Sequence, residues 1–169
     1  DFITCCQKIS QGGTRRGSFA GYLPIMHGDF DEVIDFVATK PDDVNIGWNI
    51  SDDDVEEFKK KGSEADRRRR KILKTKCTTG KGYLFFPDKV NRHRPQMYKD
   101  LGLEVKSSNL CTEITLFQDE DHTYTCVLAS MNISLYDEWK DTDAVFTATV
   151  FLDCVAEDFI VNARGVPGY

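Results

Sequence analysis

Apolar and polar positions alternate between two periods along the first fifty residues. Aromatic and aliphatic residues are dense in 18–26 and 44–50, which predicts two strands. Between them the apolar period becomes helical, and we expect a helix over 29–40 with Asp29 as its N-cap and Pro41 as its stop. The residues on one stripe of this helix are Phe30, Val33, Ile34 and Val37.

The same alternation of elements continues downstream. Ser51 and Asp54 approximate a capping box at the start of an acidic-to-basic helical region, and Ile72, Leu73 and Cys77 are expected to pack the next helix onto a core. This region holds a basic run, Lys59-Lys60-Lys61 and Arg67-Arg68-Arg69-Arg70-Lys71, whose interleaving with acidic residues favours a solvated helical surface over phosphate contacts.

Later segments predict a buried strand at 82–86, a long polar loop at 87–102 and a helix from Asp137 onward. The expected face of that last helix carries Val145, Thr149, Leu152, Ala156 and Phe159. Strands that alternate with helices indicate an α/β fold with parallel strands and right-handed crossovers.

An amide, a thiol and a carboxylate stand at alternating positions in the middle of the chain. If this segment is extended, Asn109, Cys111 and Glu113 share one face. Cys126 follows in a predicted strand at 123–130, after an acidic turn that could bring the strands side by side. A cysteine in a strand is usually a small buried hydrophobe, so spacing alone leaves both interpretations open.

The run Asn109-Leu110-Cys111-Thr112-Glu113, preceded by Ser107-Ser108, resembles the active-site loop of the large catalytic subunit of class I ribonucleotide reductase. Segment 10–19 is similar to the family's loop between effector and substrate, and segment 126–132 is similar to the strand with its second reactive thiol. The resemblance implies part of a ten-stranded α/β barrel with an active-site finger loop. It also implies that 1–169 is a central fragment of this barrel without a separate second domain.

The resemblance assigns catalytic roles to four residues. Cys111 becomes a thiyl radical that abstracts the 3′-hydrogen of a ribonucleotide, and Glu113 accepts the 3′-hydroxyl proton as general base. Asn109 orients the sugar hydroxyls, and Cys126 is one thiol of the pair that reduces the substrate. The other thiol of this pair is expected outside the chain.

The glycine-rich loop is the expected substrate and effector contact. Its residues are Gln11, Gly12, Gly13, Thr14, Arg15, Arg16, Gly17 and Ser18. Glycines allow close backbone approach, and guanidinium groups suit phosphate and base contacts. Arg15 is the strongest candidate, because Arg16 differs from the smaller residue of some family members. An ordinary glycine turn before a strand is the alternative.

Composition limits the classes of partner and the kinds of site that we expect for this chain. With 28 acidic and 22 basic residues and a net charge of -6, the chain has no overall bias toward nucleic acid or a membrane. The sequence has no apolar run long enough for a membrane helix and no signal-peptide pattern, so we expect a cytoplasmic location. The six cysteines form neither a secreted disulfide framework nor a zinc-binding pattern, so we expect reduced thiols and no metal site.

The family's catalytic subunit is several times longer than these 169 residues, and the chain begins without methionine. We therefore expect a middle piece, whether excised, cleaved or separately encoded, that is inactive alone. The resemblance implies no cofactor on this chain. It implies ATP or dNTP effectors, complementary catalytic segments, a small subunit with a metal-based radical, and a thioredoxin- or glutaredoxin-type reductant.

Other functions stay open. One alternative is a noncatalytic binding or assembly module that keeps the barrel shape. A cobalamin-dependent class II reductase would use similar thiyl chemistry. That class typically has Asn-Pro-Cys-Gly-Glu, where this chain has Leu110 and Thr112, so class I fits better.

Overall fold

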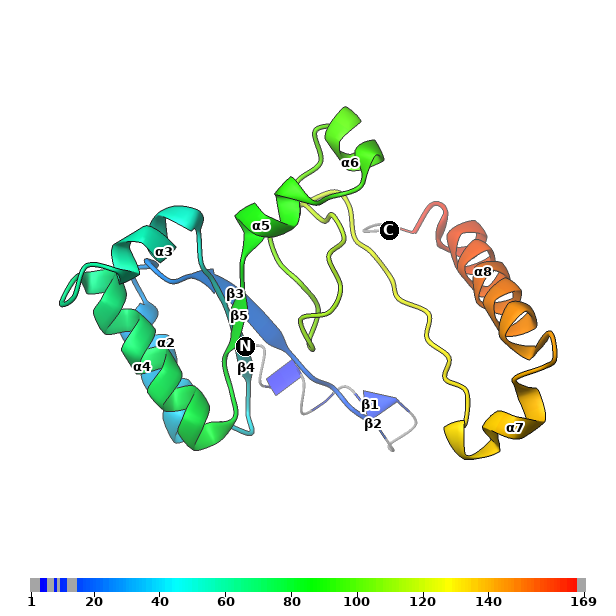
Figure 1. Ribbon diagram of the computed structural model, residues 1–169, viewed down its shortest axis with the longest axis horizontal. Coiled ribbons are helices and arrows are strands. Elements are labelled where there is room, and N and C mark those ends of the chain that lie inside the picture. Colours follow the sequence, from blue (N-terminus) through cyan, green and yellow to red (C-terminus); the bar gives the residue numbers. More distant parts are fainter. Residues whose placement is uncertain (1–3, 6–7, 9, 12–14, 167–169) are drawn as a thin grey trace. The chain divides into compact units, whose positions relative to one another are not determined.

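The computed structural model describes residues 4–5, 8, 10–11 and 15–166. The chain divides into two compact units, residues 1–116 and 117–169. Figure 1 shows a small sheet with flanking helices in the first unit and a helical segment in the second. That 1–169 forms a single domain of a larger barrel stays a prediction.

The first unit is built on a parallel sheet. Its strands are β3 (Ala20–Pro24), β4 (Asn45–Asn49) and β5 (Tyr83–Phe85), in the order β3-β4-β5. Tyr22 of β3 is opposite Gly47 of β4, which is in turn opposite Tyr83 of β5. The predicted strands are confirmed with shorter ends, and so is the parallel α/β class.

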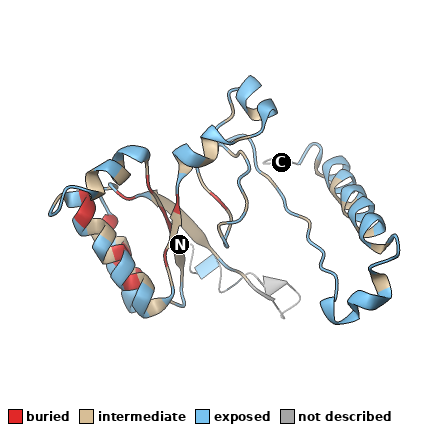
Figure 2. Cartoon of the chain, in the orientation of Figure 1, coloured by how far each residue is buried: buried red, intermediate tan, exposed pale blue. Residues whose placement is uncertain are grey.

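Helices α2 (Phe30–Thr39) and α4 (Glu64–Thr79) cover one face of this sheet (Figure 1). The core between them is centred on Trp48, whose ring centroid is 4.8 Å from that of Phe30. The buried cluster consists of Ile25, Phe30, Ile34, Val37, Ile46, Trp48 and Ile72. The predicted α2 stripe is therefore confirmed, with Val33 packed against this cluster. Figure 2 shows the buried residues concentrated in this unit.

Side-chain caps decide where the next helices begin. Ser51 Oγ accepts a hydrogen bond from Asp54 N at 3.1 Å, while Ser51 N donates to Asp54 Oδ2 at 2.8 Å. This confirms the capping box at the start of α3 (Asp52–Phe58). Gly62, with φ of +84°, and the Ser63 cap separate α3 from α4.

Ion pairs fasten α2 to α4. Asp31 accepts hydrogen bonds from Arg67 at 2.8 Å and from Lys71 at 2.9 Å. Arg68 differs from the rest of the basic run because it is 13% exposed and its Nη1 donates to two backbone carbonyls at the end of β3, those of Ile25 and His27. The predicted solvated surface is thus confirmed for most of the basic run. Arg68 is the exception, because it connects α4 to the segment that follows β3.

These ion pairs make stability depend on pH. Hydrogen bonds from Arg67 and then Lys71 hold the pKa of Asp31 well below its ordinary value of 3.8. A carboxylate whose pKa is depressed by folding stabilises the fold above its unfolded pKa and loses this effect as pH falls. We expect Asp31→Asn to lower the melting temperature by about 2–4 °C at pH 7 and progressively less below pH 3.8.

Thermal melts between pH 7 and pH 2 measure this difference. Glu32→Gln is the matched control, because Glu32 is exposed on the same helix and has no ion pair among the described residues. An Asp31→Asn deficit that stays constant across this range would contradict the assignment.

Two expectations for the first unit are wrong, one for a loop and one for the buried face of a helix. The predicted loop at 87–102 contains the short helices α5 (Pro87–Arg92) and α6 (Gln96–Asp100). Pro87 occupies the first turn of α5, where its missing N–H costs nothing. Cys77 and Leu73 are exposed, because the core face of α4 is formed by Ile72 and Thr75 instead.

The second unit contains a 3₁₀ turn (Ile133–Leu135), α7 (Tyr136–Trp139) and α8 (Ala144–Ala163). The predicted helix is confirmed, but its predicted face is only partly right, since Val145, Thr149 and Phe159 are exposed. The half-buried positions are Ala144, Ala148, Leu152, Val155, Ala156 and Ala163. Among the described residues, no helix is long and apolar enough to cross a membrane.

Candidate active site

The Cys111 segment is a tight turn rather than an extended strand. Thr112 N donates to Asn109 O at 3.2 Å, and Thr112 has a φ of +68°. The expected extended geometry, with alternate side chains on one face, is therefore wrong. The reversal of the chain puts Cys111 near the tip of the turn, where it is exposed.

Asn109 closes this turn with its side chain. Its Oδ1 accepts hydrogen bonds from Glu113 N and Ile114 N, both at 3.2 Å. Its Nδ2 donates to Glu113 Oε1 at 2.8 Å. At the base, Ser108 Oγ donates to Ile114 O at 2.5 Å. The amide and the carboxylate flanking Cys111 are thus brought together, but by a turn.

The turn lies against the sheet face that α2 and α4 leave open. Leu23 packs on the helix-covered core, so the alternation of β3 directs the neighbouring Tyr22 to the other face. Tyr22 OH donates to Asn109 O at 2.8 Å and is 2.8 Å from Thr112 Oγ1. Asn49 Nδ2 donates to Lys106 O at 2.9 Å and holds the start of the same loop.

Tyr22 and Asn49 were missed by the sequence analysis. Their signal was present, because the tyrosine and the asparagine are polar positions on strands whose other face carries Leu23, Ile46 and Trp48. The turn that they contact follows more than fifty residues later, so local pattern could not connect them.

A cavity of about 310 Å³ lies beside Cys111 at the edge where the parallel strands begin. It joins two segments that the sequence singled out separately, since Gly17 and Ser18 of the glycine loop line it together with Cys111. Its other lining residues are Phe19, Asp42, Asp43, Val44, Asn45, Lys81 and Leu110. This proximity supports a single site for the loop and the thiol.

The rest of the glycine loop is described only in part. Backbone pairing joins β1 (Ser10–Gln11) to β2 (Arg15–Arg16) in an antiparallel hairpin. Gly12, Gly13 and Thr14 lie outside the described residues, as do the side chains of Gln11, Arg15 and Arg16. Contacts of these residues with substrate or effector stay predictions.

Cys126 is exposed and belongs to the second unit. The predicted strand around it is wrong, because 123–130 pairs with no other strand in the described parts of the chain. Extended backbone becomes a strand only when a partner supplies hydrogen bonds. Within the described residues no cluster of three or more metal-binding side chains occurs.

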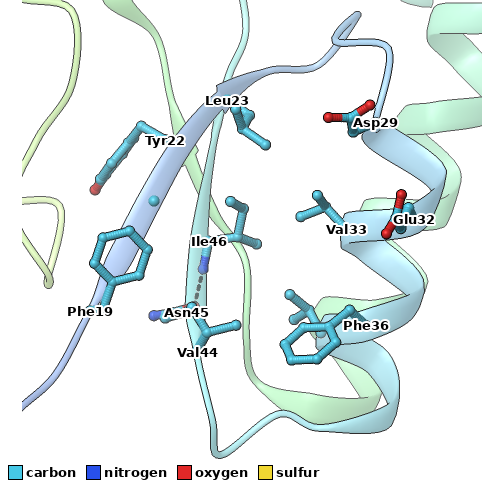
Figure 3. A pocket seen from close by; sticks show the side chains of 12 residues that line it. Phe19, Tyr22, Leu23, Asp29, Glu32, Val33, Phe36, Val44, Asn45 and Ile46 are labelled. Carbon is cyan, nitrogen blue, oxygen red and sulfur yellow. Dashed lines mark hydrogen bonds between the residues drawn. The ribbon is translucent and has the colours of Figure 1, made fainter. Parts of the chain in front are cut away.

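A larger cavity, of about 590 Å³, lies on the helix-covered side between α2 and strands β3 and β4 (Figure 3). Leu23, Val33, Phe36 and Ile46 form apolar walls there, and Asp29 and Glu32 contribute its carboxylates. Its described lining includes no cysteine, serine, threonine, histidine, lysine or arginine, and the hydroxyl of Tyr22, which also lines it, is bonded to the Cys111 turn. The candidate reactive side chains are therefore those of the Cys111 turn, on the other face of the sheet.

Residues 51–164 match the ribonucleotide reductase barrel domain. The chain belongs to the ribonucleotide reductase family. This confirms the resemblance that rested on the run from Asn109 to Glu113. The Cys111 turn and the cavity beside it therefore lie in a chain of the ribonucleotide reductase family.

Two viral proteins are among the relatives of this chain. A putative ribonucleoside-diphosphate reductase large subunit of Frog virus 3 (isolate Goorha) is 36% identical over 175 residues, covering 90% of this chain and 31% of the relative. The large subunit of Invertebrate iridescent virus 3 is 35% identical over 122 residues, which covers 72% of this chain and 19% of that relative.

A solved structure supports the same placement. The Actinobacillus ureae class Id ribonucleotide reductase alpha subunit superposes with a TM-score of 0.81 and 40% sequence identity, over 98% of this chain and 31% of that one. The chain therefore spans between about a fifth and a third of the length of these longer reductase subunits.

Proposed function

We propose that this chain contributes the radical-bearing turn of a class I ribonucleoside-diphosphate reductase, which makes deoxyribonucleotides for DNA synthesis. One observation carries the proposal. The turn joins Asn109 to Glu113 at 2.8 Å on either side of Cys111, next to the glycine loop, in a chain of this family.

In the proposed reaction, the Cys111 thiyl radical takes the 3′-hydrogen atom of the substrate and becomes a thiol. Glu113 accepts the 3′-hydroxyl proton, and Asn109 Nδ2 holds one oxygen of that carboxylate in place at 2.8 Å. The carbon radical loses the 2′-hydroxyl as water, with a proton from a thiol pair that includes Cys126. That pair then supplies its second proton, which goes to C2′, together with two electrons, and becomes a disulfide. Glu113 returns its proton to the 3′-oxygen, and Cys111 returns its hydrogen atom to C3′.

The proposal gives each remaining component a place. A metal-based centre on a separate small subunit supplies the radical, and a thioredoxin- or glutaredoxin-type protein reduces the disulfide afterwards. The loop 11–18, with Arg15 foremost, contacts the ribonucleotide and responds to ATP or dNTP effectors. Thiols that must stay reduced between turnovers fit a cytoplasmic location.

We further propose that β3, β4 and β5 form part of a ten-stranded α/β barrel, with 106–116 as its finger loop. A parallel sheet is ordinarily buried on both faces, and here helices cover one face while the loop crosses the other. Complementary segments of the catalytic subunit would close the barrel around the turn and shield the radical from solvent.

Reconstitution tests this function. We expect the chain, combined with the other catalytic segments of its longer relatives, a competent small subunit and a dithiol reductant, to convert ribonucleoside diphosphates to deoxyribonucleotides. The chain without those segments is expected to give no product. Absence of product from the complete mixture, with nucleotide binding retained, would favour the noncatalytic assembly module instead.

A further inference from the structure

The hydroxyl of Tyr22 makes contacts with the Cys111 turn from far away in the sequence. It donates to Asn109 O, 87 residues downstream, at 2.8 Å. The same hydroxyl is 2.8 Å from Thr112 Oγ1, 90 residues downstream. A tyrosine hydroxyl has one hydrogen, so when it donates to the carbonyl it accepts from Thr112. Tyr22 thus holds the residues immediately before and after the Leu110-Cys111 tip.

A glycine on the adjacent strand leaves space for the Tyr22 ring. Gly47 lies directly opposite Tyr22 in the parallel ladder, and a Cβ atom on Gly47 would be 2.2 Å from the Tyr22 ring. Phe85 of β5, which is paired with Asn49, packs its ring edge-on against Tyr22, with centroids 5.7 Å apart and an interplanar angle of 78°. The ring is therefore fixed by the sheet, and its hydroxyl is presented in one position.

The turn contains a backbone conformation that contacts with the sheet must stabilise. Thr112 is β-branched and has a φ of +68°, a left-handed conformation that such residues adopt rarely and only where the surroundings impose it. The bonds from Asn109 to Glu113 and Ile114 are local, and they can move with the turn as one body. The Tyr22 bonds connect that body to the sheet.

We infer that Tyr22 is a positioning residue that fixes the Cys111 turn on the open face of the sheet, with Gly47 as the space that permits it. Tyr22 touches the backbone and side chain of the turn rather than the reacting atoms. It sets where Cys111 lies relative to Gly17 and Ser18, which line the same cavity. This inference rests on the proposed function for its effect on turnover.

Tyr22→Phe removes the hydroxyl and keeps the ring. In the assembled reductase we expect kcat to fall about tenfold while KM for the ribonucleotide changes less than about twofold, because two hydrogen bonds that position the thiol are lost. Amide hydrogen exchange at residues 112–114, measured in the resting protein, is expected to rise about tenfold. The second measurement requires no turnover.

Tyr83→Phe is the matched control, since Tyr83 lies on β5 of the same sheet and its hydroxyl has no hydrogen-bond partner in the described parts of the chain. It should leave both quantities unchanged. Unchanged exchange in Tyr22→Phe would overturn the inference even if the reductase assay failed altogether. Faster exchange with an unaltered kcat would reduce Tyr22 to a structural contact and overturn its positioning role.

Discussion

Cys111→Ser is expected to abolish nucleotide reduction in the assembled enzyme, with a loss of at least about a thousandfold. A serine O–H bond is far stronger than a thiol S–H bond, so the radical that should reside on Cys111 has no stable equivalent on oxygen. The substitution changes little else. Cys111 is exposed and makes no hydrogen bond among the described residues, so the turn held by Asn109 should survive.

Deoxynucleotide formation and equilibrium nucleotide binding measure the two sides of this expectation. Cys77→Ser is the control, because Cys77 is also exposed but lies on α4, away from the turn. We expect nucleotide affinity to stay within about threefold in both variants. Turnover by Cys111→Ser at a rate close to that of Cys77→Ser would remove Cys111 from the mechanism.

Cys126→Ser is expected to be as severe, for a different reason. The variant should bind nucleotide and generate the substrate radical, but it lacks the thiol that delivers a proton and electrons when the 2′-oxygen leaves. In the unmodified enzyme, mass spectrometry after one turnover without reductant should find Cys126 in a disulfide with a cysteine outside this chain. Such a bridge requires Cα atoms within about 7 Å.

Cys154→Ser is the matched control, since Cys154 is another exposed thiol of the second unit, on α8. It should support turnover and form the same disulfide. An unmodified Cys126 thiol after one turnover, or a bridge from Cys126 to Cys111, would contradict the assigned roles. An unmodified Cys126 would mean that other thiols reduce the substrate. A bridge to Cys111 would mean that Cys111 belongs to the reducing pair and does not act separately as the radical.

Local sequence was sufficient for the elements whose ends and buried faces depend on near neighbours. The stripe with Phe30, Ile34 and Val37 predicted the buried face of α2, because a helix three turns long shows its period within ten residues. The capping box at Ser51 was likewise confirmed, since both of its hydrogen bonds span only three residues. The run around Cys111 also identified the family.

Long-range packing decided the rest. Exposure of Leu73, and of Val145 and Phe159 on α8, depends on which segments pack against those helices, and helical period alone does not specify them. The segment around Cys126 has strand-like composition but no partner strand in the described residues, so no ladder forms.

The candidate site shows the same division. The sequence by itself determined that an amide, a thiol and a carboxylate occur within five residues, and it favoured their convergence by strand alternation. The tertiary structure decided that a turn brings Asn109 and Glu113 together, and that Tyr22 holds this turn against the sheet. The physical reason is that a left-handed residue such as Thr112 is locally unfavourable, so contacts made 90 residues apart must stabilise it.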